Sequence, residues 1–125
     1  MYSMQTTELD EQQAVAEWAE WSTGKYPELK LLYHITNEGK RSLANGAALK
    51  RAGLKKGVPD LCLPCAKGGY HALYIEMKKD KKCKPSKDQQ EWLANLNAAG
   101  NLAIVCHSAD EAIETLKRYL NLKEG

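Results

Sequence analysis

The sequence predicts an α/β domain built from alternating helices and strands. Short apolar runs rich in β-favouring residues, such as Leu73–Met77, are typical of strands. They alternate with longer segments, such as Glu8–Trp21, whose apolar residues recur at helical spacing. Turns containing Gly or Pro separate the two kinds of segment. A chain of 125 residues that is 43% hydrophobic is long enough to bury one core.

The first half of the chain has the order helix, strand, helix. Glu8–Trp21 is amphipathic and is predicted to be a helix. Thr23–Glu28 contains Gly and Pro and is predicted to be a loop. Leu29–Thr36 is apolar and β-favouring, which indicates a strand. Arg41–Ala52 is rich in Ala, Leu, Lys and Arg, and Gly53 marks its end as a helix.

A hairpin is predicted in the middle of the chain. Val58–Pro64 and Tyr70–Lys78 both have strand patterns, and Gly68-Gly69 between them supplies the positive φ that a tight turn needs. Two further helices are expected, each capped by a serine hydroxyl: Ser86–Ala99 and Ser108–Leu120, the second with Glu111 as the partner of a capping box. Between them, Asn101–His107 is apolar on both faces, as an interior strand is.

Charge and composition restrict the classes of function. The formal net charge is only +2, but basic residues gather in the middle of the chain, which favours a surface that meets phosphate. No apolar run is long enough for a membrane span, and the N-terminus lacks the order of a signal peptide. We therefore expect no membrane association, a cytoplasmic location and four reduced cysteines.

The hairpin carries the residues that point to chemistry. Successive side chains of a strand alternate between faces, so Glu76 and Lys78 share one face while Ile75 and Met77 share the other. Asp60 lies on the preceding strand, and we expect it to come close to Glu76. Two carboxylates on rigid strands can hold Mg²⁺, and a neighbouring lysine can offset charge or position a water. This equipment suits metal-assisted hydrolysis of a phosphodiester.

These residues resemble the signature of the PD-(D/E)XK nuclease superfamily, in Pro59-Asp60 and Glu76-x-Lys78. A longer series is similar to the small stand-alone VRR-NUC proteins of bacteriophages and bacteria. In order, it comprises Asn37-x-Gly39-x-Arg41, Gly53, Gly57-Val58-Pro59-Asp60-Leu61, Ile75-Glu76-x-Lys78, Ser86-x-x-Gln89-x-x-Trp92 and Gly100. The Val-Arg-Arg sequence of the family name is absent.

The resemblance implies a restriction-endonuclease-like α/β core, with a mixed central sheet of about four strands flanked by helices. The whole chain, residues 1–125, would form one nuclease domain, with frayed ends at residues 1–7 and 121–125. It also implies catalytic roles for Asp60, Glu76, Lys78 and Gln89, the last orienting a water or a phosphate. Mg²⁺ or Mn²⁺ would bind Asp60, Glu76 and the backbone carbonyl of Met77. Glu11 would complete the metal site, with Glu8 and Glu17 as rivals.

The implied activity is that of a metal-dependent endonuclease acting on branched or duplex DNA, similar to a Holliday-junction resolvase, and working as a homodimer. If the chain is phage-encoded, the location is the cytoplasm of the host cell. Residues expected to contact DNA are Asn37, Lys40, Arg41, Lys50, Arg51, Lys56 and Lys79.

Two other interpretations remain open. The same fold can serve as a nucleic-acid-binding module without catalysis. Cys62-x-x-Cys65 invites a zinc or redox interpretation, but a structural zinc site needs a second pair with similar spacing. His34, inside a predicted strand, is typical of a packed or edge residue.

Overall fold

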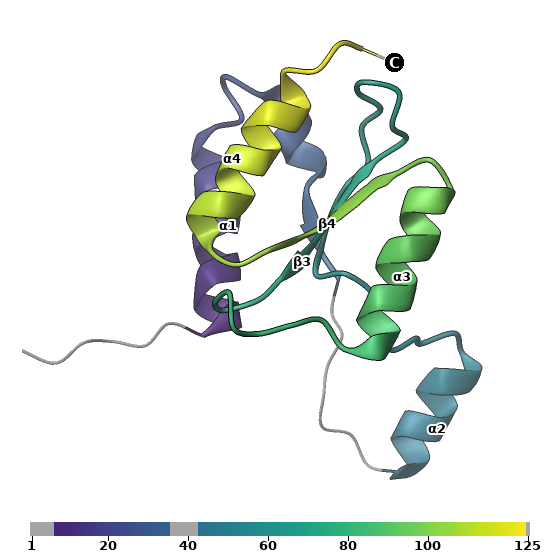
Figure 1. Cartoon of the computed structure of the whole chain (residues 1–125). Helices are drawn as coiled ribbons and strands as arrows, with labels where there is room; N and C mark the ends of the chain where they lie inside the picture. The colour runs from purple at the N-terminus through teal and green to yellow at the C-terminus, as the bar shows by residue number, and fades with distance from the viewer. Residues whose placement is uncertain (1–6, 36–42, 125) are drawn as a thin grey trace, which may run out of the picture.

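A mixed four-stranded sheet forms the centre of the molecule (Figure 1), whose computed structural model describes residues 7–35 and 43–124. The strands are β1 (Tyr33–His34), β2 (Leu61–Leu63), β3 (Leu73–Met77) and β4 (Leu102–Cys106), and they lie in that order across the sheet. β1, β2 and β3 are antiparallel neighbours, and β4 is parallel to β3. The predicted fold class is confirmed.

Helices cover the sheet from two sides. α1 (Glu8–Trp21) and α4 (Ala109–Leu120) lie side by side on one face, and α3 (Lys87–Ala98) runs along β4 on the other side (Figure 1). α2 (Leu43–Arg51) stands away from the sheet, beside the N-terminal end of α3. Within the described residues, no helix is both long enough and apolar enough to cross a membrane.

The core lies between the sheet and the α1–α4 pair. Alternation along the strands directs one set of side chains toward these helices. This set comprises Leu61 and Leu63 of β2, and Leu73, Ile75 and Met77 of β3, all at most 2% exposed. They belong to one hydrophobic cluster with Val15 and Ala19 of α1 and Leu116 and Tyr119 of α4. The residues between them, Cys62 and Glu76, point to the opposite face, where the polar site is built.

Polar contacts help to attach α3 to the sheet, because its apolar residues Trp92, Leu93 and Leu96 are only half-buried. The side chain of Asn97 pairs with the backbone of Ala103 in β4. Asn97 Nδ2 donates to the Ala103 carbonyl at 2.9 Å, and the Ala103 N–H donates to Asn97 Oδ1 at 2.9 Å. The amide group thus occupies the outer edge of β4 as a neighbouring strand would.

The segment predicted as a strand over Leu29–Thr36 differs in the structure. Its first part belongs to a 3₁₀ helix, η1 (Pro27–Leu31), and only Tyr33 and His34 form β1. Pro27 at the helix start has its φ already set for a helical turn. The turn buries Leu29, which is 3% exposed. A short apolar run can belong to a strand or to a buried helical turn, and its pattern alone does not distinguish the two.

The hairpin end and the C-terminal segment are fastened together around Lys67. Its ammonium group lies 2.9 Å from the Glu28 carboxylate and 3.0 Å from that of Glu124. The N–H of Gly68 donates to the carbonyl of Lys123 at 2.6 Å. Residues 121–124, expected to fray, therefore lie against the β2–β3 hairpin.

Candidate active site

Asp60 stands immediately before β2, and its side chain is fixed by the neighbouring strand. Its Oδ2 accepts a hydrogen bond of 2.7 Å from the backbone N–H of Met77 in β3. Its own carbonyl accepts from the N–H of Ile35 at 2.7 Å, which holds the backbone from the other side. One oxygen of the Asp60 carboxylate is thus engaged by the protein. The carboxylate is held beside Glu76, the residue that precedes Met77.

Glu76 is buried on the polar face of β3, with 2% of its surface exposed. Its Oε2 accepts from Gln89 Nε2 at 3.1 Å and lies 3.7 Å from Lys78 Nζ. Its Oε1 has no hydrogen-bond partner, and it is alone in this among the buried side-chain polar atoms of the described residues. An unpaired carboxylate oxygen in the interior is unfavourable unless a proton or a cation accompanies it.

The electrostatic setting of Glu76 is unusual. Burial, and next the negative charge of Asp60, together raise the pKa of Glu76 from its ordinary 4.5 to about 8. Lys78 opposes this rise, and the carboxylate of Glu8 adds a smaller contribution in the raising direction. Near neutral pH the group therefore retains a proton unless another positive charge replaces it.

Gln89 has two roles at the start of α3. Its Oε1 accepts from the Ser86 N–H at 2.8 Å, and the Ser86 hydroxyl accepts from the Gln89 N–H at 3.2 Å, which completes a capping box. Its Nε2 then points to Glu76. The sequence analysis predicts the Ser86 cap, but it misses the bond from the Ser86 N–H to the Gln89 side chain and the contact of Gln89 with Glu76. The Ser-x-x-Gln pattern is the signal that could have shown the capping box.

The acidic residues of α1 differ in their surroundings. Glu11, expected at the metal site, accepts a 2.7 Å hydrogen bond at Oε1 from the N–H of Ala109, the first residue of α4. Glu8 is exposed, and its charge reaches Glu76. Glu17 is exposed farther along the helix. Glu8 is therefore the α1 carboxylate whose electrostatic effect on Glu76 is evident.

The donor set suits a hard cation that keeps water ligands. In the described part of the chain no group of three or more His, Cys, Asp or Glu residues gathers as a metal site. Asp60 and Glu76 nevertheless each have one oxygen engaged by the protein, and Oε1 of Glu76 lacks a partner. Two carboxylates and several waters form the kind of coordination that Mg²⁺ accepts. The residues therefore fit the cation that the sequence predicts.

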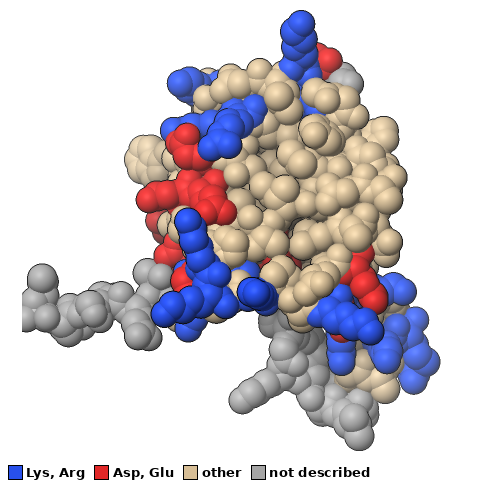
Figure 2. Space-filling view, in the orientation of Figure 1, with Lys and Arg blue, Asp and Glu red and all other residues tan. Residues whose placement is uncertain are grey.

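Basic side chains surround this end of the molecule. Lys50, Arg51, Lys56 and Lys79 are all exposed, as are Lys81, Lys82 and Lys84 of the loop that links β3 to α3, whereas Lys78 is buried. Figure 2 shows Lys and Arg gathered over α2, the start of α3 and that loop, while the face over the rest of α3 is largely uncharged. Asn37, Lys40 and Arg41, also expected to contact DNA, lie outside the described residues.

The cysteines and His34 show no feature of a metal site or of a reactive group. All four cysteines are free thiols. Cys62 is 1% exposed inside β2, and burial raises the pKa of the Cys65 thiol. Neither feature favours a metal or a reactive thiolate. His34 is exposed at the sheet edge in β1.

Paired carboxylates beside a lysine, at the ends of two neighbouring strands of a mixed α/β sheet, are the arrangement expected of a nuclease-type domain. Comparison with known proteins agrees: the sequence model of the VRR-NUC domain matches residues 5–110. A solved structure described as a VRR_NUC domain protein is 30% identical, with a TM-score of 0.84 over 99% of this chain and 94% of that one. No curated protein matches. The chain belongs to the VRR-NUC domain family, a family of nuclease type.

Proposed function

We propose that this protein is a metal-dependent DNA endonuclease, and that it prefers branched DNA in the manner of a Holliday-junction resolvase. The observation that carries the proposal is the buried, unpartnered Oε1 of Glu76 beside Asp60. Nothing in the packing of the sheet requires an acidic residue there, and burial of its ionised form is unfavourable without a cation. The proposed domain spans residues 1–125 and acts in the cytoplasm.

Asp60, Glu76 and the backbone carbonyl of Met77 are the proposed ligands of Mg²⁺ or Mn²⁺, with a carboxylate of α1, Glu8 or Glu11, as a further contributor. A cation there would supply Lewis-acid stabilisation of phosphate charge and a water of lowered pKa. Lys78, 3.7 Å from Glu76 Oε2, orients the attacking water and offsets charge that develops on the phosphate. Gln89 holds Glu76 in place. The products are a 5′-phosphate and a 3′-hydroxyl.

The basic surface around the site supports DNA as the substrate. Lys50 and Arg51 at the end of α2, Lys56 before Asp60, and Lys79 after β3 are exposed, and Lys and Arg side chains gather at this end of the molecule (Figure 2). With Asn37, Lys40 and Arg41, they form the proposed DNA contact. Such contacts position a backbone without reading its sequence, which suits recognition of DNA shape.

A homodimer is also proposed, because a two-fold axis would present two sites to two strands of a branched substrate. Exposed apolar side chains offer a surface for the second copy. They are Leu9, Trp21, Leu31 and Tyr33, exposed by 56%, 90%, 53% and 51%, and two of them, Leu9 and Tyr33, line an open groove of about 710 Å³ between α1, η1 and β1. Sedimentation of the purified protein tests this assembly, and a monomer at all concentrations would contradict it.

Cleavage of defined DNA forms tests the enzyme. Linear duplex, flap, nicked and four-way-junction DNA are incubated with the protein in Mg²⁺ and then in Mn²⁺, beside the variants Asp60→Asn and Glu76→Gln. We expect cutting of a branched form that either variant loses by at least about 100-fold. Glu91→Gln, an exposed acid on α3, is the matched control and should cut like the parent.

The competing function is a nucleic-acid-binding module without catalysis, which the same basic surface would support. Tight binding that needs no metal, together with no cutting of any DNA form in either metal, would establish that function in place of the nuclease.

A further inference from the structure

Gly57 lies at an unusually close approach between the loop that leads to Asp60 and the first turn of α3. A Cβ atom built at this position would lie 2.6 Å from the carbonyl carbon of Asp88 and 2.8 Å from the backbone nitrogen of Gln89. Both neighbours are backbone atoms of a helix, so they cannot move aside as a flexible side chain can. Gly57 also has a φ of +85°, which favours glycine.

The same turn of α3 holds Gln89 against Glu76. The amide oxygen of Gln89 accepts from the Ser86 N–H at 2.8 Å, which restrains the plane of the amide group and so the directions of the two N–H bonds at Nε2. One of these N–H bonds donates to Glu76 Oε2 at 3.1 Å. The large apolar residues of α3, Trp92, Leu93 and Leu96, are only half-buried and all lie beyond its first turn, so they do not by themselves fix how close this turn lies to the sheet.

We propose that Gly57 is a positioning residue of the active site: by admitting the backbone of Asp88 and Gln89, it sets the distance from which Gln89 reaches Glu76. The proposal rests on the proposed function for its consequence in catalysis, but not for its geometry. One loop then serves both carboxylates, because it presents Asp60 directly and places Glu76's hydrogen-bond partner.

A measurement on the unaltered protein tests the approach itself. In a nuclear Overhauser experiment, an Hα proton of Gly57 should give a cross-peak to the amide proton of Gln89, because the Cβ direction of Gly57 points at that nitrogen. Absence of the cross-peak in a folded, assigned spectrum would overturn the proposal. This measurement does not depend on any catalytic activity, so it stays decisive even if the protein cuts no DNA.

A matched pair of glycine variants tests the consequence. Gly57→Ala and Gly69→Ala impose nearly the same backbone strain, since φ is +85° at Gly57 and +88° at Gly69, but a Cβ at Gly69 meets no atom within 4 Å. We expect Gly57→Ala to shift the side-chain amide resonances of Gln89 and to lower the cleavage rate by about 100-fold, as an ångström-scale misplacement does. Gly69→Ala should leave the Gln89 amide resonances superimposable on those of the parent. Its cleavage rate should stay within about 2-fold of the parent's.

A double-mutant cycle separates positioning from general destabilisation. If Gly57 acts through Gln89, then Gly57→Ala combined with Gln89→Ala should cut no more slowly than Gln89→Ala alone, within about 3-fold. If the rate losses of the two single variants multiply in the double variant, the proposal is overturned. Gln89 amide resonances that do not shift in Gly57→Ala would also overturn it. A Gly57→Ala chain that fails to fold while Gly69→Ala folds would make the contact a requirement of the fold and would likewise overturn it.

Discussion

Glu76 couples the proposed chemistry to the pH dependence of stability. The unfolded chain loses this proton near the ordinary pKa of 4.5, whereas the folded protein keeps it up to a pKa of about 8. Between these values the folded state binds more protons than the unfolded state, so the free energy of unfolding falls as pH rises. One proton gives a slope of at most about 1.4 kcal/mol per pH unit.

We predict that Glu76→Gln removes this slope between pH 5 and pH 8, as measured by urea unfolding without metal. Saturating Mg²⁺ should also flatten the slope of the parent, because a bound cation lets the folded state ionise Glu76 as well. Glu91→Gln is the control and should keep the slope. A Glu76→Gln protein that loses stability with pH as the parent does would contradict the buried, protonated state of Glu76.

The two α1 carboxylates should separate into a structural and an electrostatic role. Glu11→Gln weakens the contact with the Ala109 N–H at the N-terminus of α4, and we expect it to cost about 1 kcal/mol of stability. Glu8→Gln should leave stability nearly unchanged and weaken Mn²⁺ binding measured by calorimetry, because the Glu8 charge reaches Glu76. The opposite pattern would make Glu11 the metal-site residue.

At the scale of elements, the attachment of α3 depends on Asn97. Asn97→Ala removes two hydrogen bonds of 2.9 Å to Ala103 and one of 2.8 Å to the Leu93 carbonyl, and it leaves the backbone groups of Ala103 without these partners. We predict a loss of about 1–3 kcal/mol in the free energy of unfolding, and faster hydrogen exchange at the Ala103 N–H. Asn95→Ala, at an exposed position two residues earlier, is the control. Unchanged exchange at Ala103 would contradict this attachment.

Local patterns predicted most of the elements and the faces of β2 and β3. They were wrong for Pro27–Leu31, which is a 3₁₀ helix, and for β4, which was expected in the interior of the sheet but lies at its edge, covered by α3. Alternation places Glu76 opposite the apolar Ile75 and Met77, and the sequence alone predicts this. The approach of Gly57 to α3 joins segments whose distance no local pattern encodes. Glu8 and Glu11 are one helical turn apart on the same helix, so spacing could not tell which of them influences Glu76.

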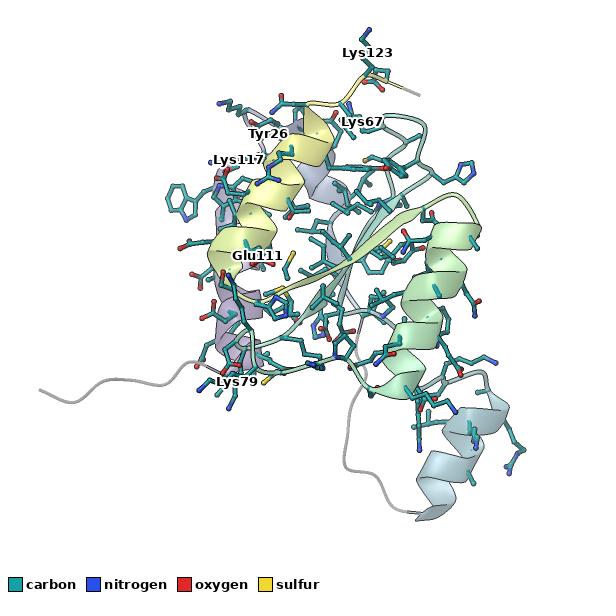
Figure 3. The ribbon with its side chains drawn as sticks, viewed as in Figure 1. Tyr26, Lys67, Lys79, Glu111, Lys117 and Lys123 are labelled. Carbon is teal, nitrogen blue, oxygen red and sulfur yellow. The ribbon has the colours of Figure 1, made fainter. Side chains whose placement is uncertain are left out.

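At the scale of the whole molecule, the two ends carry separate groups of lysines. Figure 3 places Lys79 at the end that holds the proposed site, and Lys67, Lys117 and Lys123 at the opposite end. Lys67 is 5% exposed and is committed to Glu28 and Glu124, which raise its pKa through hydrogen bonds. The Lys67 ammonium therefore holds Glu28 and Glu124 against the β2–β3 hairpin and is not part of a DNA-binding surface.

This separation predicts how DNA affinity depends on salt. Each phosphate contact contributes about 0.9 to the slope of log affinity against log salt concentration for duplex DNA. We expect Lys79→Gln to reduce the slope by about 1 in fluorescence anisotropy titrations. Lys123→Gln, at the far end, should leave the slope unchanged. Equal effects of the two variants would mean that DNA is not held at the end of the molecule where Asp60 and Glu76 lie.

The amide of Asn97 on β4 also bears on the solubility of the protein. An open strand edge offers backbone groups on which another chain can add a strand, the first step of many aggregates. The Asn97 side chain is hydrogen-bonded to the N–H and the carbonyl of Ala103. An incoming strand therefore cannot form hydrogen bonds at Ala103 without displacing it. A single side chain thereby acts as a gatekeeper against intermolecular sheet growth.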